Sequence, residues 1–204
     1  MIKFKADNNI LYLKPNFKIE EGVTMLIGAN GTGKTTLLLN IKSYLERNKK
    51  CVAYFDMLND ARLSKQWAVD SGNIQFLADT YTSSEGEGIV FKLGLIVKQV
   101  STMMNSKKAE EIYLLLDNFD NDLSIDAMQD FKNYFIKNTL DSMKEHNRHF
   151  YLIMSVNHYE ILEGQRCLDV RNNKFLTFEQ YDNYKEWVLE SRKQKEERLE
   201  KNRL

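Results

Sequence analysis

The sequence predicts an α/β fold with a largely parallel central sheet, and three observations lead to that prediction. Short apolar runs recur along the chain at residues 23–27, 51–55, 112–116 and 150–154. Segments with apolar residues at helical spacing lie between them, as at residues 35–47 and 125–144. The runs are continuous rather than alternating, which is typical of strands that helices cover on both faces. Strands that alternate with helices in this way build a mostly parallel sheet.

The composition is that of one globular domain. The 204 residues include 29 Lys and Arg against 29 Asp and Glu, with 43% hydrophobic residues and one proline. Such a chain can bury a sizeable core, which excludes the disordered, collagen-like and mucin-like classes. A zero net charge provides no global attraction to nucleic acid, so any binding of that kind requires a local patch. We expect a single domain over residues 1–204, with residues 179–204 as a charged C-terminal helix.

Other elements are expected near both ends of the chain. Further strands are predicted at residues 2–5, 10–13, 167–170 and 175–178. The last two form a hairpin, because the pair Asn172-Asn173 between them is a turn signal. Residues 89–104 are apolar nearly all the way round, as in a buried helix.

Neither export nor membrane insertion is expected. Charged residues interrupt the N-terminal segment at once, so it lacks the apolar stretch of a secretory signal. Residues 89–100, the most apolar segment, contain Lys92 and Lys98 and are shorter than the ~20 residues that cross a bilayer. Cys51 and Cys167 have the spacing of neither a zinc site nor a disulfide framework, so we expect reduced, buried thiols in a cytoplasmic protein.

The strongest functional pattern occupies residues 28–35. Their sequence, Gly-Ala-Asn-Gly-Thr-Gly-Lys-Thr, fits G-x-x-x-x-G-K-[ST] between an expected strand and an expected helix. Glycines let backbone N–H groups turn onto phosphate oxygens, and the helix N-terminus favours the same anion. Lys34 is expected to reach the β- and γ-phosphates, Thr35 to ligate Mg²⁺ and Thr36 to bind the α-phosphate. The expected nucleotide contacts are Gly28, Asn30, Gly31, Thr32, Gly33, Lys34, Thr35 and Thr36.

A second element supports nucleotide binding. The apolar run 112–116 leads into Asp117, the form of a Walker B element, which holds Mg²⁺ through water. An apolar strand that ends in Asp is common. Its position downstream of residues 28–35, which we call the phosphate loop, is what makes Asp117 evidence for nucleotide binding. Together these elements predict a P-loop NTPase with ATP and Mg²⁺ as cofactors.

These features resemble the ATP-binding cassette (ABC) ATPases, particularly their soluble DNA-repair and chromosome-maintenance branch. The likeness begins with Asn30 before the central glycine and with the two threonines after the lysine. Residues 83–88, Ser-Ser-Glu-Gly-Glu-Gly, are similar to the signature motif of that family. The resemblance implies that Ser84 and Gly86 bind the γ-phosphate of ATP held by the opposite subunit. Glu85 departs from the motif, and an exposed loop that caps a helix is the alternative interpretation.

Two further motifs of the family have counterparts. Residues 123–126 are similar to the D-loop, whose aspartate, here Asp126, touches the opposing phosphate loop; they also fit the capping box of a helix. After the strand at 150–154, either His158 or Asn157 stands at the position of the switch histidine. The candidates for the Q-loop glutamine and the adenine-stacking aromatic are Gln66, Gln75 and Tyr12.

Asn118 is the largest departure from the family. The resemblance implies a glutamate directly after the Walker B aspartate, where it polarises the attacking water, and an amide cannot accept that proton. Either turnover is slow, or another carboxylate such as Asp120 takes over, or the chain was altered to trap an ATP state.

The resemblance extends from Ile2 to the hairpin near Phe178 and implies a three-layer sandwich with a mostly parallel central sheet and a reduced helical subdomain. Too few residues separate Lys34 from Ser84 for coiled-coil arms. It also implies an ATP-sandwiched homodimer that acts as a switch on a DNA or protein partner, without a membrane partner. A regulatory module that binds ATP without hydrolysis is the alternative, and a nucleotide-kinase-type phosphotransferase is a third.

Overall fold

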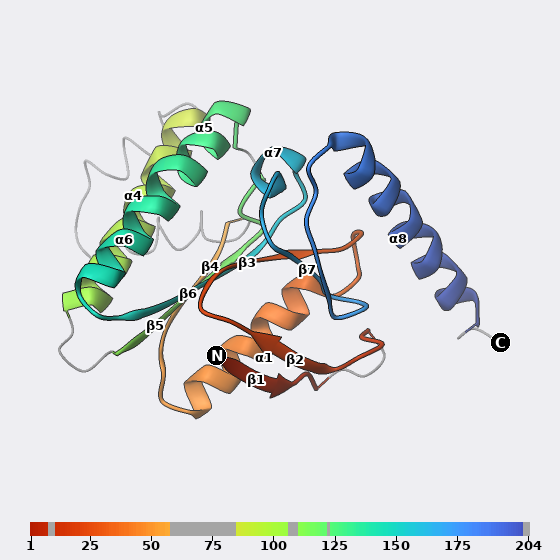
Figure 1. The fold of residues 1–204 in the computed structure, drawn as a ribbon, viewed down its shortest axis with the longest axis horizontal. Helices are drawn as coiled ribbons and strands as arrows, with labels where there is room; N and C mark the ends of the chain where they lie inside the picture. The colour runs from red at the N-terminus through yellow and green to blue at the C-terminus, as the bar shows by residue number, and fades with distance from the viewer. Residues whose placement is uncertain (8–10, 58–84, 106–109, 122, 202–204) are drawn as a thin grey trace.

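A six-stranded sheet forms the centre of the computed structural model, which describes residues 1–7, 11–57, 85–105, 110–121 and 123–201 (Figure 1). Its strand order is β4-β5-β6-β3-β7-β8. The strands are β3 (Gly22–Ile27), β4 (Cys51–Asp56), β5 (Glu111–Asp117), β6 (His149–Ser155), β7 (Cys167–Asp169) and β8 (Lys174–Leu176). Neighbouring strands pair in parallel from β4 to β7, and β8 runs antiparallel to β7. The predicted α/β fold with a mostly parallel sheet is confirmed.

Helices cover both faces of the sheet and make three layers. One face packs against α4 (Glu85–Asn105) and against α5 (Ile125–Asp130) and α6 (Lys137–Glu145), which a π-helical segment (Phe131–Ile136) joins. The other face packs against α1 (Lys34–Arg47). In β5, Leu114 contributes to the first layer of apolar contacts and Leu115 to the second. Because both faces are covered, the strands are apolar throughout, as their sequences predict.

Two strands near the N-terminus form a separate small sheet beside α1. The pair consists of β1 (Ile2–Lys5) and β2 (Asn16–Ile19), which run antiparallel. The strand expected at residues 10–13 is therefore wrong, because residues 11–13 lie outside any strand and β2 begins after Pro15. Tyr12 instead turns its side chain under the loop after β3, where its Oη donates to the carbonyl of Gly33 (2.8 Å).

The predicted hairpin near the C-terminus is confirmed as β7 and β8, with Asn173 of the turn at a φ of 52°. A short helix, α7 (Tyr159–Leu162), precedes it, and α8 (Tyr181–Lys201) follows it. Trp187 packs its ring against Phe178, with 5.5 Å between centroids, and so docks α8 on the body. Among the helices that the structure describes, none combines the length and apolar character needed to cross a membrane.

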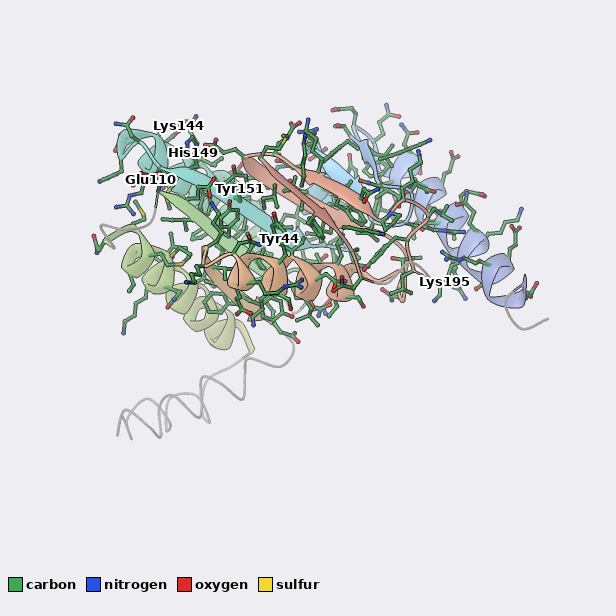
Figure 2. The ribbon with its side chains drawn as sticks, turned by 90° about the horizontal axis from the view of Figure 1, so that it is seen from below. Tyr44, Glu110, Lys144, His149, Tyr151 and Lys195 are labelled. Atoms are coloured by element: carbon green, nitrogen blue, oxygen red, sulfur yellow. The ribbon has the colours of Figure 1, made fainter. Side chains whose placement is uncertain are left out.

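Figure 2 shows the molecule from the side of α1. Tyr44 of α1 and Tyr151 of β6 belong to the apolar layer between that helix and the sheet. His149, with which β6 begins, lies at one end of this view and Lys195 of α8 at the other. The functional motifs belong to the end where the parallel strands terminate and α8 lies.

The two cysteines are free thiols in the structure. Cys167 is buried, and burial raises the pKa of its thiol to about 12. Cys51 is only half-buried. At neutral pH the Cys167 thiol therefore stays protonated and behaves as a small apolar side chain.

Candidate functional site

The loop between β3 and α1 has a backbone that requires glycine. Gly31 and Gly33 have φ values of 78° and 97°, and Gly33 is the N-cap of α1. Residues with a Cβ pay roughly 1–2 kcal/mol for this left-handed region. A Cβ on Gly33 would also lie 3.0 Å from Leu11 Cδ1 and 3.1 Å from Tyr12 Oη. Because α1 begins after Gly33, the N–H groups of its first turn have no partner within the helix and can bind an anion.

Lys34 is the buried cation of this loop. Lys34 is only 8% exposed, and its Nζ donates to the carbonyl of Gly28 (2.7 Å). Desolvation lowers the pKa of Lys34, while the charges of Asp120 and Asp117 oppose that shift. The ammonium group thus has two carboxylates nearby and a carbonyl oxygen that a phosphate oxygen can replace.

Asp117 ends β5 with a fully buried carboxylate that three groups hold in place. Its Oδ1 accepts the backbone N–H of Asn118 (3.1 Å) and the hydroxyl of Ser155 (2.5 Å). Its Oδ2 accepts the hydroxyl of Tyr54 at 3.3 Å. Since the two hydroxyl donors come from β4 and β6 on either side, the sheet itself orients the carboxylate.

Asp120 is a second buried carboxylate, 1% exposed, and it fixes the turn after β6. Its Oδ2 accepts the backbone N–H groups of Asn157 and His158, the latter at 2.6 Å. Its Oδ1 is buried and has no hydrogen-bond partner among the described residues. Asp120 therefore positions the end of β6 with one oxygen and keeps the other available.

The conformation of Asn118 accounts for an amide at this position. Its φ is 52°, in the left-handed region. Asn is enriched several-fold there because its short polar side chain tolerates that backbone better than longer side chains do. A glutamate at Asn118 would carry this backbone cost.

Of the two switch candidates at the end of β6, Asn157 is the one that lines a pocket. The side chain of His158 is exposed, and its backbone N–H serves Asp120. The carbonyl of Asn157 accepts the hydroxyl of Tyr184 from α8. The geometry therefore favours Asn157.

The remaining loop residues divide by exposure. Thr32 is buried and donates its backbone N–H to the carbonyl of Ala29 (3.1 Å), which closes the loop from within. Thr35 and Asn30 are exposed, and Thr36 is half-buried. The hydroxyls expected to reach Mg²⁺ and the α-phosphate thus lie at the surface, on the first turn of α1.

The signature and D-loop predictions have different outcomes in the structure. Ser84, Gln66 and Gln75 lie outside the described residues, and Gly86 falls in the first turn of α4. Asp126 lies in the first turn of α5, where hydrogen bonds from Ser124 and from backbone N–H groups hold the pKa of its carboxyl below the usual value. Ser124 is the N-cap of α5 but makes no side-chain capping hydrogen bond, so both interpretations of Asp126 stay predictions.

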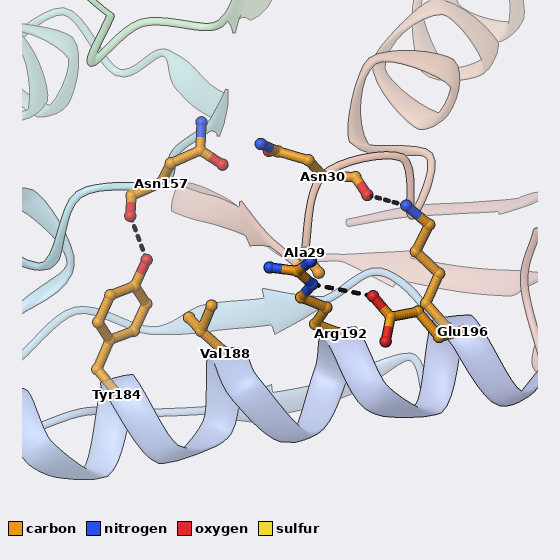
Figure 3. A pocket seen from close by; sticks show the side chains of 9 residues that line it. Ala29, Asn30, Asn157, Tyr184, Val188, Arg192 and Glu196 are labelled. Carbon is orange, nitrogen blue, oxygen red and sulfur yellow. Dashed lines mark hydrogen bonds and ion pairs between the residues drawn. The ribbon is translucent and has the colours of Figure 1, made fainter.

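Helix α8, which the sequence predicts only as a charged helix, forms one wall of the site. A pocket of about 480 Å³ lies between it and the phosphate loop (Figure 3). The lining residues are Gly28, Ala29, Asn30, Asn157, Tyr184, Val188, Arg192, Lys195 and Glu196. Tyr184, Val188, Arg192 and Glu196 recur every fourth position, so they share one face of the helix. The four-residue spacing is visible in the sequence, but it does not indicate what this face of the helix covers.

The interpretation of Tyr12 as an adenine-stacking residue is wrong. Tyr12 is 2% exposed, and its ring packs edge-on against Phe17, with 5.3 Å between centroids. Neither face is open to a base. Its role is structural, as a support under the phosphate loop.

Replacing Tyr12 with phenylalanine is expected to lower the free energy of unfolding by about 1 kcal/mol, because the carbonyl of Gly33 loses one of its two donors and keeps the N–H of Leu37, while the ring packing remains. Burial raises the pKa of Tyr12, so the phenol is protonated and donates at neutral pH. Urea denaturation measures the change. Tyr134→Phe, at a side chain 65% exposed, is the control. Equal stability of both variants and the unmodified chain would contradict the prediction.

Comparisons with known proteins add little to this description. No protein-family model matches the chain, and no curated protein is significantly similar to it. One solved structure that it resembles is described as the crystal structure of a DNA replication initiation factor, with 19% identity over 68% of this chain and a TM-score of 0.34. The match covers 33% of that protein, so this chain corresponds to about a third of its length. No function is taken from a likeness at this level.

Proposed function

We propose that this chain binds Mg-ATP at the phosphate loop and acts as an ATP-dependent switch of the ABC type. One observation carries the proposal. The buried Lys34 of the glycine-dependent loop lies close enough to two buried carboxylates, those of Asp117 and Asp120, for their charges to interact with its ammonium. Buried charges of this kind are costly unless they serve a ligand or one another. A triphosphate with its divalent cation fits both signs of charge.

Each residue has a defined task in this proposal. The loop N–H groups and Lys34 bind the β- and γ-phosphates, and Thr36 adds a hydrogen bond to the α-phosphate. The hydroxyl of Thr35 and the oriented carboxylate of Asp117 hold the cation, which neutralises phosphate charge when bound. Tyr54 and Ser155 keep that carboxylate in one orientation.

Hydrolysis is proposed to be slow. The amide of Asn118 follows Asp117 where the family resemblance implies a general base, and an amide accepts no proton. A module that binds ATP without turnover is the second candidate, and the left-handed backbone at Asn118 favours it because that backbone selects the amide.

A calorimetric titration of Mg-ATP into the protein tests the proposal. We expect saturable binding of one nucleotide per chain, weaker when EDTA removes the metal. Absence of binding at millimolar Mg-ATP would reject the proposal. A steady-state ATPase assay then separates the slow enzyme from the non-hydrolysing module.

An Asn118→Glu variant is expected to hydrolyse ATP faster than the unmodified chain, by about tenfold or more, because it supplies the missing proton acceptor. It is also expected to lose about 1 kcal/mol of stability, since glutamate must adopt the φ of 52°. Asn118→Gln is the matched control, with the same backbone cost and no base. Turnover no faster in the Glu variant than in the Gln variant would place the base elsewhere, with Asp120 as the first candidate.

The proposed output is an ATP-sandwiched homodimer that acts on a DNA or protein partner. In the structure α8 faces residues 28–30, the first part of the phosphate loop, across a shared pocket. A second copy that approaches the terminal phosphate has to share this face with α8. Light scattering with and without Mg-ATP tests pairing, and a monomer at saturating ATP would reject the sandwich while leaving ATP binding intact.

A further inference from the structure

Helix α8 is fastened to the body by hydrogen bonds that cross long stretches of sequence. The guanidinium of Arg171, a residue 9% exposed, donates from Nη2 to the carbonyl of Gln194 (2.9 Å). Farther along the helix, Arg198 donates from Nη1 to the carbonyl of Leu11 (3.2 Å). Two arginines on opposite sides of the contact therefore hold this helix as an integral wall of the site.

The same helix contacts the phosphate loop directly. Ser191, 7% exposed, accepts the backbone N–H of Ala29 through its Oγ (3.4 Å). One turn later, Lys195 donates from Nζ to the carbonyl of Asn30 at 2.6 Å. A Cβ on Gly31 would lie 2.9 Å from that Nζ, so the ammonium of Lys195 lies directly against Gly31.

The pocket between α8 and the loop has two cationic side chains and one acidic side chain among its lining residues. Its volume is about 480 Å³, so α8 covers the loop but leaves space between them for a ligand. Arg192 and Lys195 are its two cationic lining residues, and Glu196 is its acid. Glu196 accepts Nε of Arg192 at 3.0 Å, and both side chains are largely exposed at the mouth of the pocket (Figure 3). Among the described residues, the hydrogen-bond partner of Lys195 Nζ is a neutral carbonyl, which an anionic oxygen can replace.

We propose that Arg192 and Lys195 bind the terminal phosphate of the ATP that the phosphate loop of the same chain holds. The inference rests on the proposed function and adds residues outside every recognised motif. In this inference α8 adds two cations of the same chain to the phosphate site, beside the carbonyl of Asn30.

The test compares the affinities of Mg-ATP and Mg-ADP by calorimetry for the full chain and for an Arg192→Ala/Lys195→Ala double variant. We expect at least a tenfold loss of ATP affinity and less than about a twofold change for ADP, because only the terminal phosphate loses charged partners. Lys193→Ala, an exposed lysine of the same helix outside the pocket lining, is the matched control and should change neither affinity. Equal losses for both nucleotides, no loss, or a gain in ATP affinity would each overturn the inference.

A substitution of opposite expected sign guards against an effect of misfolding. Glu196→Gln removes the carboxylate that competes for Arg192, so ATP should bind about two- to fivefold tighter, with ADP unchanged. Unchanged or weaker ATP binding in this variant counts against the inference. The two proposals fail differently: a chain that binds neither nucleotide rejects both, whereas normal ATP binding that the α8 substitutions leave untouched rejects only the role of α8.

Discussion

Replacing Lys34 with alanine is expected to reduce the affinity for Mg-ATP by about a hundredfold or more, because charge-assisted hydrogen bonds to phosphate are among the strongest that a side chain forms. The loss should be this large because Lys34 is 8% exposed, where water screens its charge weakly. ATP-dependent pairing of two chains should disappear with binding. Calorimetry and light scattering measure the two effects.

The unliganded protein should respond to the same substitution in a different way. In it, Lys34 donates to the Gly28 carbonyl, and burial of its ammonium disfavours the charged form. Removing the ammonium relieves that burial cost but also removes its attraction to Asp117 and Asp120, so the free energy of unfolding should change by no more than about 2 kcal/mol. Lys42→Ala is the control on the same helix, since Lys42 forms an exposed pair with Glu46 (2.8 Å). ATP binding or ATP-driven pairing that survives in Lys34→Ala would contradict the proposed site.

Replacing Asp117 with asparagine is expected to abolish the dependence of ATP affinity on Mg²⁺. The amide oxygen can still accept the N–H of Asn118 and the hydroxyl of Ser155, so the local structure should persist. What disappears is the negative charge that a hard divalent cation requires. The ratio of ATP dissociation constants in EDTA and in Mg²⁺ should fall from about tenfold or more to near one.

Asp169→Asn supplies the control for this experiment. Asp169 is also a buried carboxylate at the end of a strand, β7, where it accepts the backbone N–H of Arg171 (3.0 Å). Its substitution should leave the Mg²⁺ dependence intact even if stability falls. If Asp117→Asn retains the full Mg²⁺ effect, the metal is held elsewhere and the assignment of Asp117 is wrong.

The sheet and the phosphate loop were predictable because their causes are local or periodic. A strand covered on both faces must be apolar at every position, so β5 is visible in the sequence itself. The loop is equally visible, since its backbone demands glycine at Gly31 and Gly33. The error over residues 10–13 has a tertiary cause: Tyr12 is buried between Phe17 and the phosphate loop without belonging to a strand, and an apolar run looks the same in both cases.

The role of α8 could not be predicted for a related reason. Its contacts with the loop and with Leu11 join side chains to backbone groups, and any sequence provides backbone N–H and carbonyl groups. A charged helix that closes a site and one that faces solvent can have the same composition. The amide at Asn118 is visible in the sequence, but its left-handed backbone is known only from the structure.

The return of α8 to the phosphate loop also bears on how the protein forms during synthesis. The bond between Ala29 and Ser191 joins residues 162 positions apart, and that between Leu11 and Arg198 joins residues 187 positions apart. Contacts so distant in sequence form late, because the chain between them must be ordered first. The ribosome makes the loop before α8, so a nascent chain that still lacks α8 exposes an unfinished loop. Nucleotide binding by nascent chains should therefore change when α8 emerges from the ribosome.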